Sequence, residues 1–342
     1  MKQLLQLSGL FDRLRDYMNL RLVPICVLSL ILLSGTGCLD ARAALEGSFD
    51  RTLSVSGTVD LDVSTGSGSI HVKTGDGTTV RVNGLIRARD DFQARADEKV
   101  RYLQSNPPIE QAGNVIRIGQ IQDSRYRNNV SISYEIVVPP DTHLRSKTGS
   151  GQQSVDGIRG PAEVSTGSGN LTVSNVGGGL IARTGSGRID LDAIKGRVEA
   201  HTGSGRIQAS GIEGAFKADT GSGGVTMGQT APGDVEVSAG SGNLEVSGVK
   251  GALRARTGSG HISAGGEPVG EWDLHTSSGG VTVRLNSAAA FDLDARTSSG
   301  RITVNHPLTV MGTVSPKATR GKVRGGGALL NLTTGSGNIT VE

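Results

Sequence analysis

A four-residue sequence, Thr-Gly-Ser-Gly, recurs along most of the chain at a nearly constant interval. Complete or slightly varied copies begin at Thr65, Thr148, Thr166, Thr184, Thr202, Thr220, Ala239, Thr257, Thr276, Thr297 and Thr334. From the second to the tenth copy the intervals are 18, 18, 18, 18, 19, 18, 19 and 21 residues. The last interval is 37 residues, which predicts one degenerate repeat between Thr297 and Thr334. A fixed period of this kind is typical of solenoids and other repeat folds.

Apolar residues keep the same positions in every repeat. The residues five and seven after the start of the tetrad are apolar, as in Ile207 and Ala209. Those two and four before it are also apolar, as in Ala200 and Val198, and polar residues such as Gln208 lie between. Alternation with a period of two is the pattern of a strand with one buried face. Each repeat therefore predicts two short strands joined by the tetrad.

A repeat of this size cannot bury its own apolar face, but stacked copies bury a continuous one. We therefore predict an all-β fold, a parallel β-solenoid in which each repeat forms one rung. A meander of antiparallel hairpins is the alternative, and the identity of residue types down each column favours parallel stacking. Only 10 of the 342 residues are aromatic, so the core must come from aliphatic residues. We attribute the 52 glycines to turns that need a positive φ.

The segment before the regular array has a different pattern. Residues 47–141 are predicted to form a small amino-terminal α/β cap, and residues 142–342 the solenoid array. A cap is needed because the open end of a solenoid exposes apolar side chains and unpaired strands. Strands are predicted near 114–118 and 130–138.

One helix is predicted inside the cap segment. Asp90 or Asp91 is its expected N-cap, and Pro107 with Pro108 ends it. The expected buried positions follow a helical spacing and are Phe92, Ala96, Val100 and Leu103.

The amino terminus has the composition of a targeting segment. The apolar run from Leu22 to Leu33 is 12 residues long, too short for a membrane span of about 20 residues, and residues 1–37 are predicted to be a signal peptide. Residues 34–38 resemble a bacterial lipobox, so Cys38 is the predicted lipidation site. Cleavage after Ala43 and an uncleaved anchor are the alternatives. We expect an extracytoplasmic protein: a lipoprotein facing the periplasm or cell surface, or a secreted or soluble periplasmic form.

Charge and cysteine content exclude other classes. The net charge is +3, of which residues 1–43 carry +2, so the balance of the remainder argues against a nucleic-acid-binding surface or a polybasic membrane-binding surface. The two cysteines, Cys26 and Cys38, both precede the repeats, so no disulfide framework is expected.

The repeats predict no catalytic, cofactor-binding or metal-binding residue. A calcium-binding β-roll needs aspartate where these repeats have residues such as Ile189. His201 and His275 share a column but lie four rungs, or about 19 Å, apart, too far to share a metal. Asp190 and Asp192 are ordinary outward residues of a strand.

Two features of the tetrads remain as alternatives. Their successive amides could form anion-binding nests, with Arg183, Arg188 and Arg206 adding charge. Their Thr and Ser side chains could instead form external ladders, like those of ice-binding solenoids.

Several of these motifs resemble one bacterial family. They are Gly47-Ser48-Phe49, the run at 63–68, the strand at 132–140 ending in Val-Pro-Pro, and the serial tetrads. The family is labelled "putative adhesin", has a β-solenoid fold and is of unknown function. The resemblance covers residues 47–342. It implies a non-enzymatic, extracytoplasmic envelope protein and supplies no catalytic residues.

We therefore expect a non-enzymatic cell-envelope scaffold or adhesion-like binding module. The alternatives are an envelope-stress or signalling component that binds a partner protein and, third, a periplasmic carbohydrate-active enzyme. The expected partner is an envelope protein or a cell-wall glycan, with membrane attachment through a lipidated Cys38. The last repeat carries Ile339 and Val341 at inward positions, which predicts an open final rung and self-association through it.

Overall fold

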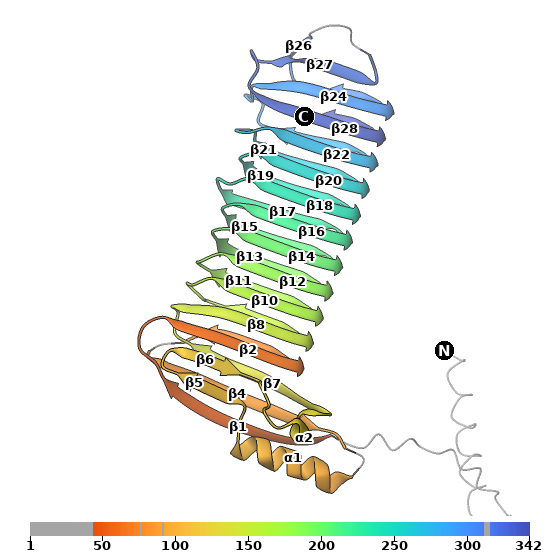
Figure 1. The fold of residues 1–342 in the computed structure, drawn as a ribbon. Helices are drawn as coiled ribbons and strands as arrows, with labels where there is room; N and C mark the ends of the chain where they lie inside the picture. The colour runs from red at the N-terminus through yellow and green to blue at the C-terminus, as the bar shows by residue number, and fades with distance from the viewer. Residues whose placement is uncertain (1–43, 76, 91, 311–314) are drawn as a thin grey trace, which may run out of the picture. The chain divides into compact units, whose positions relative to one another are not determined.

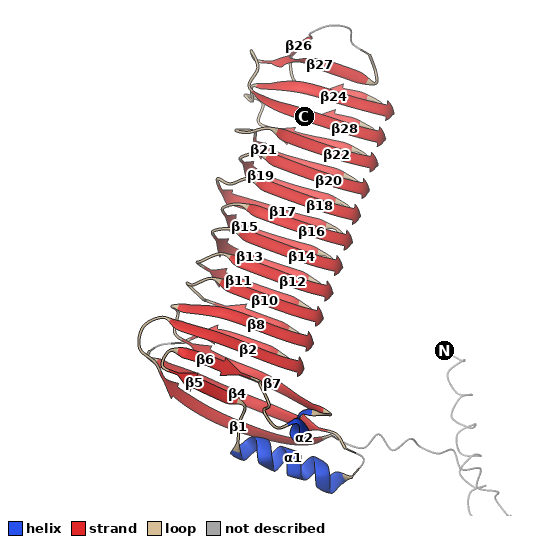
Figure 2. Cartoon of the chain, in the orientation of Figure 1, coloured by secondary structure: helices blue, strands red, loops and turns tan. Residues whose placement is uncertain are grey.

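The computed structural model describes residues 44–75, 77–90, 92–310 and 315–342 (Figure 1). These residues form one compact unit. Two β-sheets, here called sheet A and sheet B, run through it (Figure 2). The two helices of the described residues, α1 (Gln93–Ser105) and α2 (Ser124–Arg127), both lie at the amino-terminal end.

Sheet A has 14 strands among the described residues. In spatial order they are β1 (Leu45–Ser54), β4 (Thr79–Ala88), β7 (Val130–Val138), β3 (Ile70–Thr74), β9 (Gln153–Asp156), β11 (Leu171–Val176), β13 (Ile189–Lys195), β15 (Ile207–Glu213), β17 (Val225–Ala231), β19 (Leu244–Lys250), β21 (Ile262–Glu267), β23 (Val281–Leu285), β29 (Ile339–Val341) and β25 (Ile302–Val304).

Sheet B has 15 strands among the described residues. In spatial order they are β26 (Leu308–Val310), β27 (Ala318–Val323), β24 (Phe291–Ser299), β28 (Ala328–Ser336), β22 (Trp272–Ser278), β20 (Leu253–Ser259), β18 (Val235–Ser241), β16 (Phe216–Ser222), β14 (Val198–Ser204), β12 (Leu180–Ser186), β10 (Ala162–Ser168), β8 (Thr142–Ser150), β2 (Val59–Ser67), β6 (Val115–Ile118) and β5 (Ile109–Ala112).

Successive repeats stack in parallel and in register. Thr166 of β10 lies beside Thr148 of β8 on one side and beside Thr184 of β12 on the other. Sheet A follows the same rule, because Ile189 of β13 lies between Leu171 and Ile207. Each repeat therefore contributes one strand to each sheet. The prediction of a parallel β-solenoid is confirmed, and the antiparallel meander is excluded for the repeats.

The predicted inward columns form the core between the two sheets. Ile207 is 0 % exposed and Ala209 is 6 % exposed, whereas Gln208 between them is exposed. The larger side chains of the inner columns, Phe216 and Trp272, are also buried. Every rung thus adds aliphatic surface to a single continuous core.

The inward and outward positions can be tested with one pair of variants. Ile207→Asp places an unpaired carboxylate in the core, where we expect a loss of several kcal/mol in the free energy of unfolding. Gln208→Asp places the same carboxylate on the surface and should cost less than about 0.5 kcal/mol. Thermal denaturation of the two proteins measures the difference. Equal melting temperatures would contradict the assignment of faces.

The tetrad glycines are required by the stacking of turns as well as by positive φ, which the second glycine has at Gly223, Gly242, Gly260, Gly279 and Gly337. The first glycine of the tetrad, for example Gly203, does not have a positive φ. A Cβ at Gly203 would lie 2.6 Å from the carbonyl oxygen of Gly185 in the preceding rung, and one at Gly185 would lie 2.5 Å from the oxygen of Gly167. The prediction that turn dihedrals explain these glycines is therefore wrong at this position. The first position nevertheless accepts serine in two tetrads, as Ser277 and Ser298. The second glycine is present in every tetrad, because a Cβ there, as at Gly205, would lie 1.9 Å from the carbonyl oxygen of Gly187 in the preceding rung.

The tetrad threonine lies inside the turn, so the alternative of an external threonine ladder is wrong. Thr202 is 5 % exposed. Its hydroxyl donates a hydrogen bond of 3.1 Å to the carbonyl oxygen of Gly187, the second tetrad glycine of the preceding rung. The same bond, 2.8–3.2 Å long, recurs at Thr148, Thr166, Thr184, Thr220, Thr257, Thr276, Thr297 and Thr334. These bonds fasten each turn to its neighbour.

The one tetrad that begins with alanine offers a test of this bond. Ala239 is 7 % exposed and occupies the same position as Thr220 and Thr257 in the flanking rungs. In Ala239→Thr the new hydroxyl should reach the carbonyl oxygen of Gly223 and raise the free energy of unfolding by about 1 kcal/mol. Chemical denaturation measures the change. The reverse change, Thr202→Val, should lower stability by a similar amount, and a loss of stability in Ala239→Thr would contradict the proposed role of the hydroxyl.

The amino-terminal end joins the cap and the solenoid without a break. β2 pairs in parallel with β8, and β3 with β9, so residues 59–74 already form a rung. The predicted boundary at residue 141 thus separates strands that belong to the same two sheets. Beyond this rung, β1, β4 and β7 pair antiparallel in sheet A, and α1 packs on β1 and β4.

The predicted helix forms, but its first turn differs from the prediction. Its buried residues are Ala96, Lys99, Val100 and Leu103. Phe92, expected in the core, is the N-cap residue and is 61 % exposed. Lys99 is buried in its place because its ammonium group lies 2.8 Å from the carboxylate of Asp90. The helix ends before Pro107, as predicted.

The carboxyl-terminal rung lies inside the stack. β28 pairs with both β22 and β24, and β29 with both β23 and β25. Ile339 and Val341 are both 0 % exposed. The predicted open final rung is therefore wrong, and self-association through it loses its basis. The expected degenerate repeat is also wrong, because β26 and β27 form an antiparallel pair added to β24 at the end of sheet B.

Candidate functional site

Charged side chains of alternating sign line the outer face of sheet B. The residue three positions before each tetrad points outward. Nε of Arg145 lies 3.3 Å from Oε2 of Glu163, and Nη1 of Arg183 lies 3.5 Å from Oε1 of the same glutamate. Further along, Nζ of Lys217 lies 3.3 Å from Oε2 of Glu236. Each of these pairs joins neighbouring rungs. The parallel register places Arg145 beside Glu163 and Lys217 beside Glu236, whereas Arg183 reaches Glu163 from two residues further along its strand.

This series of ion pairs, which we call the charge ladder, continues to the other end of the sheet. Asp273 lies 2.8 Å from Arg256 of the neighbouring strand β20. Asp294 of β24 pairs with Arg320 of the neighbouring strand β27 and, within its own strand, with Arg296 at 2.9 Å. Exposed ion pairs of this kind contribute only about 0–1 kcal/mol each. The ladder therefore contributes more to the register of the rungs and to the near-neutral charge of the face than to its stability.

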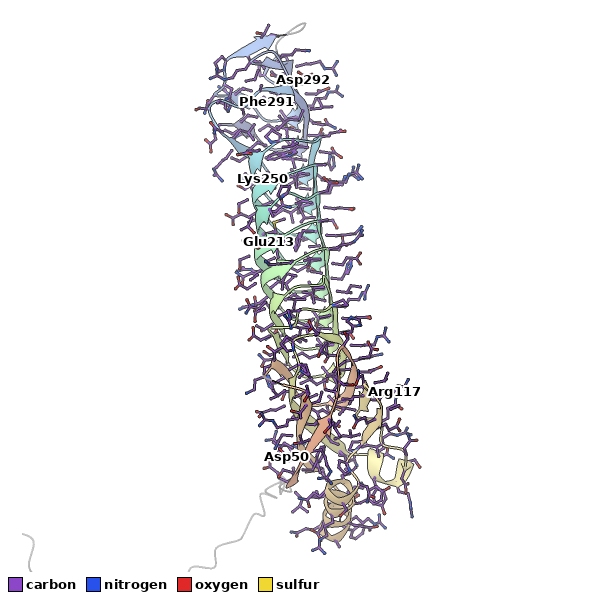
Figure 3. All side chains as sticks on the ribbon, turned by 90° about the vertical axis from the view of Figure 1, so that its left-hand side faces the viewer. Asp50, Arg117, Glu213, Lys250, Phe291 and Asp292 are labelled. Carbon is purple, nitrogen blue, oxygen red and sulfur yellow. The ribbon has the colours of Figure 1, made fainter. Side chains whose placement is uncertain are left out.

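A groove of about 590 Å³ crosses the amino-terminal end of this face. It runs over β2, β8, β10, β12 and β14 and is bordered by β6. Figure 3 shows the side chains that stand out from the sheets and places Arg117 of β6 near this end. We call this feature the N-terminal groove. Side chains that line it include Asp60, Arg117, His143, Arg145, Ile181 and Arg197.

Most polar groups of the N-terminal groove are paired within it. Nδ1 of His143 lies 3.0 Å from Oδ1 of Asp60, and Nε of Arg197 donates a 3.0 Å hydrogen bond to Glu199. Arg117 makes no ion pair or side-chain hydrogen bond with any residue that the structure describes. Arg117 is therefore a cation of the groove that is available to a ligand. The paired groups can in addition exchange their present partners for groups of a ligand.

The chemistry of the groove suits an extended polar ligand. Donors and acceptors repeat along it at the spacing of adjacent strands, about 4.8 Å. The partly exposed side chain of Ile181 adds an apolar contact. None of the residues that line the groove is aromatic, so it lacks the stacking platform on which sugar rings commonly lie.

A His–Asp–Ser arrangement on the same face is not a nucleophilic triad. Nδ1 of His201 lies 3.1 Å from Oδ2 of Asp219. The hydroxyl of Ser238 bonds to the other oxygen of the same carboxylate. A serine nucleophile needs its hydroxyl on the histidine that acts as base. The carboxylate here separates the two side chains, so the arrangement serves the stacking of rungs.

His201 and His275 lie four rungs apart, as predicted from the sequence. His201 lies on β14 and His275 on β22, four strands further along sheet B. The described part of the chain contains no group of three or more His, Cys, Asp and Glu side chains placed to hold a metal. Asp190 and Asp192 lie on the outer side of β13, in sheet A.

The amide of the second tetrad glycine and that of the residue after it already donate hydrogen bonds to neighbouring rungs. The amide of Gly187 donates to the carbonyl oxygen of Ser204 in the next rung, at 3.1 Å. The amide of Arg188 donates to Oδ1 of Asn170 in the preceding rung, at 3.0 Å. Of the predicted cations, Arg183 is paired with Glu163. The alternative of an anion-binding nest therefore loses the amides of Gly187 and Arg188.

The outer face of sheet A is lined by small polar side chains. A shallow groove of about 340 Å³ over β11, β13 and β15 includes Ser174, Asp192 and Ser210. At its edge, Asp156 accepts hydrogen bonds from the hydroxyl of Ser174 at 2.6 Å and from the amide of Asn175 at 2.8 Å. These bonds hold the pKa of Asp156 below its usual value. They connect neighbouring rungs, as the charge ladder does on the opposite face.

The pKa of Asp156 predicts a small dependence of stability on pH. Because the pKa in the folded state is lowered from 3.8, the stabilisation is present above that pH and is lost as the pH falls through the folded value. We expect less than about 1 kcal/mol, since the group is exposed. Asp156→Asn should thus lower the melting temperature near neutral pH and make little difference only below the lowered folded-state pKa of Asp156. Melting curves at several pH values measure this, with Glu245→Gln on the same face as control. A difference that is constant with pH would contradict the assignment.

The predicted signal peptide and lipidation site, including Cys38, lie outside the described residues. Within the described residues, neither helix has the length and apolar character needed to cross a membrane. Localisation therefore remains a prediction from the sequence.

Sequence reasoning missed the N-terminal groove. The strand at 114–118 was predicted, but its pairing with β2 was not, and this pairing brings Arg117 beside Asp62. Part of the ladder was visible in the sequence as outward charges three positions before the tetrad, as in Arg145, Glu163 and Lys217, although Ile181 interrupts this column. Opposite charges at this position in consecutive repeats were the signal that could have indicated ion pairs between rungs.

Some solved structures show a limited likeness to this chain. A "putative cell adhesion protein" from Clostridium sporogenes is 11% identical, with 87% of this chain and 99% of that chain covered and a TM-score of 0.24. A "putative adhesin" from Bacteroides fragilis is 12% identical, with 86% and 97% covered and a TM-score of 0.26. A "putative lipid binding protein" from Parabacteroides distasonis is 12% identical, with 86% and 96% covered and a TM-score of 0.30. At these TM-scores the likeness carries no functional argument.

No curated protein matches the chain. The profile of the family described as Toastrack DUF4097 matches residues 116–342, about two thirds of the chain. The match begins on β6 and includes all the regular rungs from β8 onward. The resemblance of the serial tetrads to an adhesin-labelled solenoid family is thereby confirmed, and the chain belongs to the Toastrack DUF4097 family.

Proposed function

We propose that the protein is a non-enzymatic binding module of the cell envelope, a scaffold or adhesion-like protein that holds its ligand in the N-terminal groove. The observation that carries the proposal is the groove itself. It is the place where an unpaired cation, Arg117, an exposed part of Ile181 and the start of the charge ladder come together. The predicted signal peptide supports the envelope as its location.

Binding is favoured over catalysis by the chemistry of the groove. Its acids and bases are mostly paired with each other, as in His143 with Asp60 and Arg145 with Glu163. An enzyme site needs groups with shifted pKa values in a cleft that excludes water. The described groups whose pKa is shifted, such as Asp156 and Tyr134, lie outside the groove.

An extended polypeptide segment of mixed charge fits the groove better than a glycan. Ion pairs between rungs can be exchanged for ion pairs with a ligand whose charges repeat at a similar spacing, and such exchange favours specificity over affinity. A glycan would find no aromatic ring to stack on, because no Phe, Tyr or Trp lines the groove. The partner is therefore proposed to be a protein of the envelope.

Photo-crosslinking in intact cells tests this proposal. A photoreactive amino acid in place of Ile181, in the groove, should give a crosslinked protein adduct. The same residue in place of Thr226, on the outer face of sheet A, is the matched control and should give none. In the protein with the photoreactive residue at position 181, the further change Arg117→Glu should reduce the yield of the adduct about ten-fold or more, because reversal of a charge at an interface costs several kcal/mol of binding free energy.

The outcomes separate the alternatives. Equal crosslinking from both positions would reject the groove as the site. Calorimetry can also test whether cell-wall glycan fragments bind the purified full chain. If they bind, and Arg117→Glu abolishes the binding, the ligand of the groove is a glycan and not a polypeptide. Turnover of any glycan would reject the non-enzymatic proposal.

A further inference from the structure

The chain enters the compact unit through a basic surface at its amino-terminal end. Ala44, the first described residue, lies in a depression of about 540 Å³ together with Arg87, Arg89 and Asn129. The first pair of β1 and β4, Leu45 with Ala88, fixes this position, and the amide of Arg89 donates to the carbonyl oxygen of Asn129 at 2.9 Å. α1 begins immediately after this strand, at the same end (Figure 1).

Three cations on this surface have no carboxylate partner among the described residues: Arg89, Arg95 and Arg127. All three are exposed. The other cations here are paired, as in Arg87 with Glu46 and Arg125 with Asp123. Residues 87–101 and 123–127, counted with the Glu46 that pairs with Arg87, carry seven Lys and Arg against six Asp and Glu. The surface therefore keeps a positive charge after its internal pairs are formed.

An exposed aromatic ring lies among these cations. Phe92 is 61 % exposed, the most exposed aromatic ring among the described large hydrophobic residues. The guanidinium carbon of Arg95 lies 4.9 Å from the centre of its ring. An apolar ring flanked by arginines is the combination that binds at the boundary between lipid headgroups and acyl chains.

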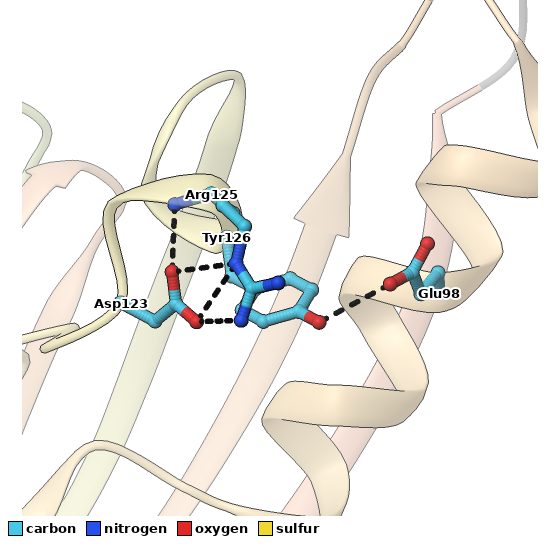
Figure 4. A network of polar contacts seen from close by, with 4 residues as sticks. All are labelled: Glu98, Asp123, Arg125 and Tyr126. Carbon is cyan, nitrogen blue, oxygen red and sulfur yellow. Dashed lines mark hydrogen bonds and ion pairs between the residues drawn. The ribbon is translucent and has the colours of Figure 1, made fainter.

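Contacts between the two helices hold the third cation in place. The rings of Tyr102 and Tyr126 are stacked with centres 3.9 Å apart. The hydroxyl of Tyr126 donates to Glu98 at 3.1 Å, and Asp123 caps α2 through the amide of Arg125 (Figure 4). Partial burial and then the bond to Glu98 raise the pKa of Tyr126. α2 is thereby fixed to α1, and Arg127 is its last residue.

We propose that this surface, formed by Arg89, Phe92, Arg95 and Arg127 and here called the cap patch, binds the headgroups of anionic phospholipids. Its position supports this occupant. Cys38, the predicted lipidation site, precedes Ala44 by six residues, which span at most about 20 Å. A lipid on Cys38 would therefore keep the cap patch within reach of the membrane surface. The cap patch is separate from the N-terminal groove, so neither proposal depends on the other.

A fluorescence experiment on the full chain tests the cap patch directly. Phe92→Trp introduces an indole at the centre of the patch, and the native Trp272, which is 0 % exposed, provides a buried background signal. Vesicles are made from brominated phosphatidylcholine alone or with phosphatidylglycerol. We expect the bromine atoms to quench the introduced indole several-fold more strongly in the anionic vesicles, and high salt to remove the difference.

Charge variants provide the matched control. Replacement of Arg89, Arg95 and Arg127 by Gln should abolish the extra quenching, since each arginine near an anionic surface contributes about a five-fold gain in partitioning. The control replaces Arg188, Arg206 and Arg301 by Gln, three exposed arginines of the tetrad turns. It removes the same charge and should leave the quenching unchanged. Both proteins should keep the parental melting temperature.

Three results would overturn the proposal. They are equal quenching in neutral and anionic vesicles, no quenching in either, and an equal loss of quenching in the two triple variants. Because the readout is local to Phe92→Trp, attachment of the chain through Cys38 or through residues 22–33 does not by itself produce the expected result. Crosslinking at Ile181 reports on the groove independently.

Discussion

The contact between each tetrad and the tetrad of the preceding rung is the constraint on which this structure depends. A Cβ at the second glycine would approach the carbonyl oxygen of the rung below, as at Gly205 against Gly187. The threonine hydroxyl then bonds to the second glycine of that rung, as in Thr202 to Gly187. Together these contacts set both the distance between rungs and their register. With the register fixed, every inward column stacks like on like, and one aliphatic core forms without large aromatic rings.

A stack whose rungs share one register can accept them in any order. Thr334 lies between Thr276 and Thr297 with the same alignment on both sides, so the last strands of the chain fill an interior position. This arrangement leaves the antiparallel pair β26 and β27 at the end of sheet B. At the other end, α1 packs on β1 and β4. At each end of the stack, elements that do not follow the repeat therefore take the place of a further parallel rung, which would expose an unpaired strand edge.

The same register determines what the outer faces can do. Charges placed at one position of each repeat become neighbours at the spacing of strands and neutralise each other, as Arg145 and Glu163 do. Cations without such a partner among the described residues also occur where the repeat is interrupted, at Arg117 on β6 and at Arg89 and Arg127 beside the helices. Proposed binding surfaces thus lie at the amino-terminal end, because irregular strands there bring together residues that the repeat does not pair.

The sequence by itself determined the parallel solenoid, the inward columns such as Ile207 and Ala209, and the presence of a helical cap, because a fixed period with two-residue alternation permits few other structures. Only the tertiary structure decided that Thr202 faces inward, that Phe92 is exposed, and that Ile339 lies between two other rungs. The physical reason is the same in each case. Local periodicity fixes the face of a strand, whereas the order of rungs and the contacts at the ends depend on which segments, distant in the sequence, share an edge.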